Sequence, residues 1–173
     1  MPEYDRVYGA KVIQSGIFEY KELYRYTYNW LVDNNYDVTE KKYSEKINPN
    51  GKEVEIEWDS SRKISDYFKF QIKVAWKIMG MTTVEVEKNG AKLKMQKANV
   101  EIRTSSVLIK DYEHRWEDNP FYKWLRTLYD RYLIRTRITD YEMKLIGETD
   151  EFLAQIKSFL ALEGQRATME ASH

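Results

Sequence analysis

The stretch that decides the fold is FKFQIKVAWKI, which runs from Phe68 to Ile78. Its apolar residues alternate with lysine, glutamine and alanine, so they share one face of an extended chain. Val54, Ile56 and Trp58 alternate with glutamates in the same way. This period of two is typical of strands with one buried face and one wet face. If the two strands pair antiparallel, glutamates lie beside lysines on the wet face, and we expect cross-strand charge pairs there.

The next hairpin can be registered from its turn. The sequence Lys88-Asn89-Gly90-Ala91 is typical of a two-residue type I′ turn. That turn sets Val86 opposite Leu93 and Val84 opposite Met95, so pattern and turn agree. Further strands are predicted at Val7–Gln14, Tyr36–Ile47, Val100–Ser105 and Val107–Trp116. Ser15-Gly16 ends the first of them, and the turn Asn48–Gly51 ends the second. A bulge is expected in the last one, near Lys110-Asp111.

Helices are predicted on both sides of these strands. Apolar residues at helical spacing indicate one helix over Phe18–Asn34 and a long helix from Pro120 to Ile146, which Gly147 stops. A second C-terminal helix begins near Thr149 and is followed by a frayed tail over residues 165–173. We expect a single α+β domain over residues 1–164. It comprises a curved antiparallel sheet of about seven strands, packed by the N-terminal helix and the long C-terminal helix, plus a terminal helical hairpin.

The apolar residues of the long helix change side along its length. Phe121, Leu125 and Leu128 lie almost opposite Ile138 and Leu145. Two interpretations stay open. Either the first half packs on the sheet and the second half pairs with the terminal helix, or the C-terminal helices form a homodimer contact.

The composition excludes several classes of function. The chain has 173 residues, 28 basic and 28 acidic side chains, and no cysteine. Balanced charge provides no overall attraction to nucleic acid or an anionic membrane, so charged recognition must be local. The lack of cysteine excludes disulfides and thiolate sites and favours a cytoplasmic protein. No apolar run is long enough to span a bilayer, and we expect no membrane partner.

Few residues suggest catalysis. The histidines are His114 and His173, and no pair of histidines has the spacing of metal ligands, so we expect no metal. Phosphate-cradling glycine motifs are absent, and we expect no cofactor. His114 shares a strand face with Tyr112 and Trp116, where it could act as a general acid or base of a hydrolase or isomerase. Alternatively it is a hydrogen-bonded strand residue, and we favour a protein without enzymatic activity.

The segment from Tyr122 to Arg137 is the local candidate for macromolecular recognition. Aromatic rings alternate in it with an excess of basic side chains, a combination that suits RNA, where stacking and phosphate contacts add. The basic residues are Lys123, Arg126, Arg131, Arg135 and Arg137, against the single acid Asp130. Alternatively, these arginines belong to a solvated helix face and pair with neighbouring acids.

The order of elements over residues 7 to 146 resembles the helix-grip, or START-like, superfamily. The stretches Lys63–Phe70 and Pro120–Ile134 are also similar to an uncharacterised archaeal protein group. The helix-grip resemblance implies a hydrophobic cavity between the sheet and the long helix. Its wall candidates are Trp30, Phe70, Trp76, Leu93, Tyr112, Trp116, Leu128 and Tyr132.

Two functions lead on this basis. The first is a non-catalytic interaction module that docks on a protein or ribonucleoprotein partner through the segment from Tyr122 to Arg137 or through the terminal hairpin. The second is a helix-grip-like binder of a small hydrophobic or aromatic ligand. The hydrolase or isomerase that uses His114 is the third.

Overall fold

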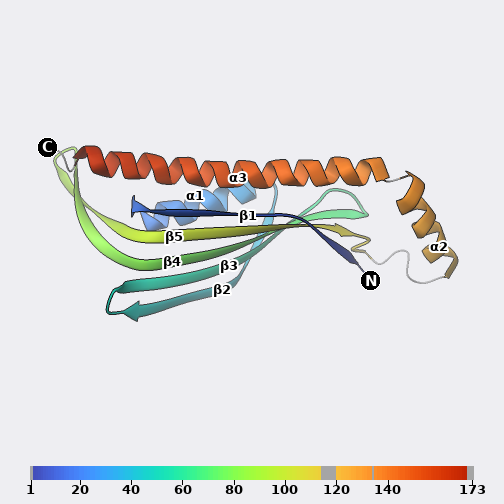
Figure 1. Cartoon of the computed structure of the whole chain (residues 1–173), viewed down its shortest axis with the longest axis horizontal. Coiled ribbons are helices and arrows are strands. Elements are labelled where there is room, and N and C mark those ends of the chain that lie inside the picture. Colours follow the sequence, from blue (N-terminus) through green and yellow to red (C-terminus); the bar gives the residue numbers. More distant parts are fainter. Residues whose placement is uncertain (1, 114–119, 134, 171–173) are drawn as a thin grey trace.

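The fold is α+β and is built on one open antiparallel sheet (Figure 1). The computed structural model describes residues 2–113, 120–133 and 135–170. The strands are β1 (Glu3–Phe18), β2 (Asp37–Asn48), β3 (Gly51–Lys63), β4 (Phe68–Lys88) and β5 (Ala91–Lys110). Their order across the sheet is β1-β5-β4-β3-β2, so the first strand pairs with the last. The helices are α1 (Tyr20–Asp33), α2 (Pro120–Leu128) and α3 (Arg135–Glu170), with a π-helical turn (Tyr129–Leu133) between the last two.

The sheet has five long strands, where about seven were predicted. β1 continues past Ser15-Gly16 to Phe18, and β4 and β5 each join strands that were predicted as separate. The β4–β5 pairing stays continuous because the register shifts by one residue between Met79 and Thr82. Gly80 provides the positive φ of 64° at this bulge. Gly51 packs so closely against it that a Cβ at Gly51 would lie 2.7 Å from the carbonyl carbon of Gly80.

The predicted hairpin register is confirmed. Asn89 and Gly90 both have positive φ, 51° and 78°, as a type I′ turn requires. Val86 pairs with Leu93, and Val84 pairs with Met95. The bulge expected near Lys110-Asp111 is instead the end of β5: Asp111 follows it with a φ of 52°. The predicted last strand, Val107–Trp116, therefore stops at Lys110, and residues 114–116 lie outside the described part of the chain.

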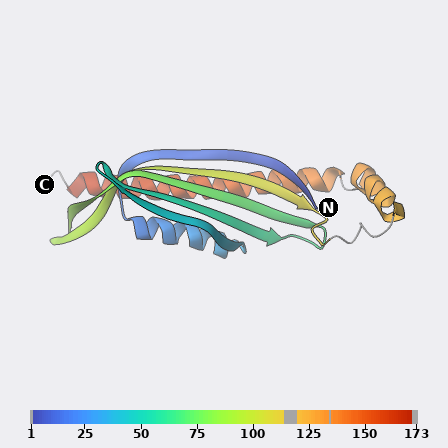
Figure 2. The ribbon, with the colours of Figure 1, turned by 90° about the horizontal axis from the view of Figure 1, so that it is seen from below.

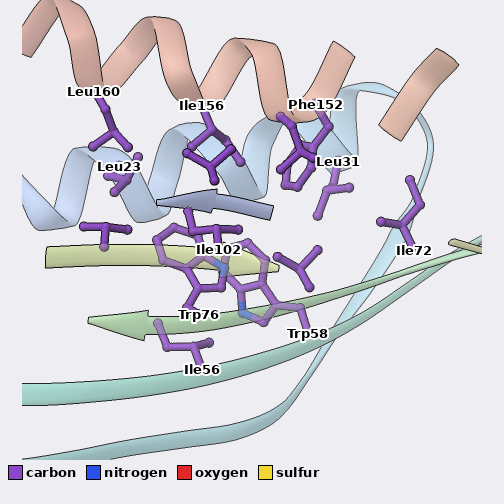
Figure 3. Packing of buried hydrophobic residues seen from close by; sticks show 14 of the residues in the cluster. Leu23, Leu31, Ile56, Trp58, Ile72, Trp76, Ile102, Phe152, Ile156 and Leu160 are labelled. Carbon is purple, nitrogen blue, oxygen red and sulfur yellow. The ribbon is translucent and has the colours of Figure 1, made fainter. Parts of the chain in front are cut away.

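Both α1 and α3 lie on the same face of the sheet, and no helix of the described residues covers the opposite face (Figures 1 and 2). The core fills the space between them, where alternate strand residues such as Ile56, Ile72 and Ile102 meet Phe152 and Ile156 of α3 (Figure 3). Aromatic rings also contact one another there: the ring centroids of Trp58 and Trp76 are 5.2 Å apart. The alternation in the sequence thus correctly identified the buried face.

The C-terminal region is not a helical hairpin. α3 continues through Gly147 and extends to Glu170, beyond the predicted start of the tail. The predicted long helix is itself interrupted, because the π-helical turn separates α2 from α3. This break explains the change of side in the apolar pattern, since the segments before and after it meet different surroundings. Leu145, Phe152 and Ile156 of α3 are completely buried in the core.

A buried polar cluster holds α3 to the rest of the fold. The guanidinium of Arg62 on β3 lies 2.6 Å from the carboxylate of Glu148 on α3. The hydroxyl of Tyr36 donates to the same carboxylate at 2.6 Å. Arg62 also donates to the backbone carbonyl of Asn34 at the end of α1. Burial, followed by the hydrogen bond to Glu148, raises the pKa of Tyr36 above its ordinary value.

Within the described residues, no helix combines the length and the apolar character needed to cross a membrane.

Candidate functional site

Helix α2 projects past the end of the sheet near the N-terminus (Figure 1). Its aromatic side chains are exposed. Phe121 is 59% exposed and Trp124 is 58% exposed. Their ring centroids lie 6.1 Å apart, so they form one aromatic surface on the helix. Leu125 and Leu128 continue the same stripe at helical spacing and are only half-buried. None of the described residues of α2 is buried, which is unusual for a helix with such an apolar side.

An ion-pair network fastens α2 to the sheet. The guanidinium of Arg126 lies 3.2 Å from the carboxylate of Asp111 and 2.8 Å from that of Glu3. Asp111 is almost fully buried, and its own N–H donates to the backbone carbonyl of Tyr67 at 2.8 Å. Glu3 also lies 3.2 Å from the ammonium of Lys110. These contacts fix the position of α2 and engage Arg126, which was predicted as a macromolecule-binding residue.

The pKa of Lys110 shows how strongly this network is charged. Burial lowers the pKa of the ammonium, but the carboxylates of Asp5 and Glu3 outweigh burial and raise it above the ordinary value. The nearest contact is Asp5, at 2.9 Å. Lys110 therefore stays protonated beside the base of α2, and the network acts as a structural anchor.

The other predicted basic residues face solvent. Lys123, Arg131, Arg135 and Arg137 are all exposed. Tyr132, in the π-helical turn, is 72% exposed. Aromatic and basic side chains are thus exposed together from α2 to the start of α3, on a stretch that we call the aromatic–basic segment (residues 121–133 and 135–137).

The seven cavity candidates within the described residues lie in different parts of the fold. Trp30, Phe70 and Trp76 lie in or against the core. Leu93 is exposed in the β4–β5 hairpin, and Tyr132 is exposed beyond the sheet. Leu128 is half-buried in α2. The hydroxyl of Tyr112 donates to the backbone carbonyl of Ser65 at 2.7 Å. Trp116 lies outside the described residues.

The three interior candidates contact other rings. Trp30 lies 5.1 Å from Phe152, and Phe70 lies 6.1 Å from Tyr141, both measured between ring centroids. His114, the weak catalytic candidate, falls outside the described residues, as does His173. Within the described part of the chain no group of three or more histidine or carboxylate side chains is placed to hold a metal ion.

Sequence reasoning missed a groove on the helix-free face of the sheet. It has a volume of about 710 Å³ and crosses the strands. Its basic side chains come from distant strands and include Arg6 and Lys11 of β1, Lys73 of β4 and Arg103 of β5. Their alternation with buried residues was a signal that these side chains face water. The β1–β5 register that brings them together joins residues roughly ninety positions apart, and no turn indicates it.

The predicted cross-strand pairs on this face are confirmed as partners in register but not as ion pairs. Lys73 is opposite Asp59, and Lys77 is opposite Glu55. Asp59 instead accepts a hydrogen bond from Gln71 at 2.7 Å, and Glu55 pairs with Lys42 of β2 at 2.5 Å. Within the described residues, Lys73 lines the groove and forms no ion pair.

No family model, no curated protein and no solved structure matches the chain.

Proposed function

We propose that this protein is a non-catalytic interaction module that docks on a protein or ribonucleoprotein partner through the aromatic–basic segment. The observation that carries the proposal is the exposure of Phe121 and Trp124 on a helix that the fold anchors but does not cover. Large rings left in water on an anchored element are typical of interaction sites, since burying them on a partner supplies much of the binding energy.

The chemistry of the segment indicates what its partner offers. The apolar stripe of α2 suits a hydrophobic groove that takes the face of an amphipathic helix. Exposed cations at Lys123, Arg131, Arg135 and Arg137 favour acidic side chains or phosphates around that groove. Because Arg126 is engaged by Asp111 and Glu3, its role is to hold α2 in place and not to contact the partner.

The test replaces the exposed rings by a polar residue of similar helix propensity, in the double variant Phe121→Ser/Trp124→Ser. The matched control is Ile13→Ser/Ile47→Ser, which removes two exposed apolar side chains from the sheet. The full-length proteins are tagged and purified from the cells in which the chain is native, and associated proteins and RNA are quantified. Both variants should unfold within about 0.5 kcal/mol of the wild type, because all four sites are exposed.

We expect the partner to be enriched by the wild type and the control and lost from the α2 variant. A partner set that is identical for all three proteins would exclude α2 as the docking site. Replacement of Arg131 and Arg135 by glutamate separates the two kinds of partner. If RNA association persists unchanged in that variant, the aromatic–basic segment does not contact RNA, and docking on a ribonucleoprotein through this segment is discarded.

A small-ligand function has weaker support. We also propose that the fold is a reduced relative of the helix-grip superfamily, because β1 pairs with the last strand and a long C-terminal helix lies across the sheet. Its ligand cavity would have to lie where Trp30, Phe70 and Trp76 now contact other core residues. Binding of a hydrophobic dye that quenches the fluorescence of Trp76 would favour this alternative.

A further inference from the structure

The groove on the helix-free face of the sheet has a floor of small side chains and a rim of long basic ones. Gly9 of β1, Ser105 of β5 and Ala75 of β4 line its floor. Gly9 and Ser105 are directly opposite each other in the β1–β5 ladder. A Cβ added at Gly9 would lie 2.8 Å from the guanidinium of Arg6, so this arginine folds over the glycine at one side. The lining extends from β1, at one edge of the sheet, to Lys41 of β2 at the other edge.

The charge of the groove is positive although the chain as a whole is neutral. Its charged lining residues are the cations Arg6, Lys11, Lys41, Lys73 and Arg103 and the acids Glu57 and Asp59. Five cations against two acids leave a formal charge of +3. Arg103 pairs with Glu101 beside the groove. Among the described residues Lys11, Lys41 and Lys73 form no ion pair, and the Arg6 guanidinium lies over Gly9 without a carboxylate partner.

The shape of the groove distinguishes between kinds of anion. Four spacings between neighbouring strands, at about 4.8 Å each, make the sheet about 19 Å wide, which is much longer than one phosphate group. The N–H groups of the strands donate to neighbouring strands and are not free for a ligand. Neither a glycine-rich loop nor a helix N-terminus lines the groove. The usual binding site for the phosphate of a mononucleotide is therefore missing from its lining. The only ring in the lining belongs to Trp58, which is buried on the helix side, so bases have no stacking platform here.

We infer that this groove binds the phosphodiester backbone of a single-stranded nucleic acid, with little dependence on base sequence. Arg6, Lys11, Lys41 and Lys73 contact successive phosphates, and the small floor residues let the chain lie close to the sheet. The site lies on a different part of the molecule from the aromatic–basic segment and goes beyond the function proposed above. Together the two sites would let one module hold both the protein and the RNA of a ribonucleoprotein.

The test measures binding of a short fluorescein-labelled oligouridylate by fluorescence anisotropy over a series of salt concentrations. The groove variant is Lys11→Gln/Lys73→Gln. The matched control is Lys77→Gln/Lys97→Gln, which removes the same charge from exposed lysines on the same sheet outside the groove. With four phosphate contacts the wild type should show a slope of log K against log salt of about −2.8, and the groove variant about −1.4. The control should keep the wild-type slope.

Three results would overturn the inference. In the first, the wild type does not bind the oligonucleotide. In the second, the salt slope of the control falls as much as that of the groove variant. In the third, polyglutamate displaces the oligonucleotide as effectively as unlabelled RNA does, which would assign the groove to acidic protein segments. A second variant, Ala75→Glu, places a carboxylate on the floor at an exposed position and should also weaken binding. Groove variants should still co-purify the partner that depends on Phe121 and Trp124, so failure of one proposal is distinguishable from failure of the other.

Discussion

Substitution of Gly147 by alanine should stabilise the protein, because the C-terminal helix continues through this position. If a helix ended at Gly147, the same substitution would destabilise the protein. Gly147 lies inside α3, its φ is not positive, and a Cβ there would have no neighbour within 4 Å. Alanine at an exposed helix position is favoured over glycine by about 0.8 kcal/mol, because glycine loses more backbone entropy on folding. No contact is lost in exchange, so the whole difference should appear in the free energy of unfolding.

Urea unfolding followed by circular dichroism and tryptophan fluorescence measures this difference. With a slope of about 2 kcal/mol per molar urea, a gain of about 0.8 kcal/mol raises the midpoint by about 0.4 M. The control is Gly51→Ala, which should destabilise by about 1 to 3 kcal/mol, because Gly51 has a φ of 122° and touches the backbone of Gly80.

A loss of about 1 kcal/mol in Gly147→Ala would refute the continuous helix. That result is expected if Gly147 ends a helix in the left-handed conformation, as the sequence pattern predicts.

Three further predictions concern the polar contacts that hold the three helices to the sheet. Glu148→Ala should destabilise the protein by about 3 kcal/mol in urea unfolding, because it removes the carboxylate that Arg62 and Tyr36 contact. An effect below about 1 kcal/mol would contradict the role of this polar cluster in holding α3. Arg126→Ala should speed amide hydrogen exchange in α2 while α3 stays protected near Phe152, and unchanged exchange in α2 would show that the ion pairs do not anchor it. Burial and then the hydrogen bond to Glu40 raise the pKa of Tyr24 to about 12. Stability should therefore fall as the pH rises from 10 to 12, because the folded state keeps a proton that the unfolded state has lost. In thermal unfolding at a series of pH values, Tyr24→Phe should show a smaller loss of stability over this range.

The strands were predictable where local signals agree. Alternation between Phe68 and Ile78 identified the buried face, and Asn89-Gly90 set the register of its hairpin. The number of strands was not predictable, because β4 and β5 each continue through changes of pattern that suggested separate strands, and in β4 a bulge at Gly80 keeps the pairing continuous. Gly147 was likewise misread as a helix stop, since a glycine tolerated inside a helix and one that ends it look the same in sequence.

The functional surfaces could be predicted only in part. Composition identified the aromatic–basic segment, and the change of apolar side along it indicated two different environments. The role of Arg126 as an anchor could not be found, because its partners Glu3 and Asp111 reach it through the tertiary fold. The groove depends on the pairing of β1 with β5, the first and last strands in the sequence. No local sequence signal indicates a pairing between such distant segments.

Site-specific photo-crosslinking tests the docking role of α2 most directly. A benzophenone amino acid is introduced at Trp124 in one protein and, as a control, at Ile47, which is 89% exposed on the edge strand β2. After irradiation in the native cells, we expect a discrete adduct from position 124 and none of the same mass from position 47. No adduct at position 124, or the same adducts from both positions, would contradict docking through the exposed rings of α2.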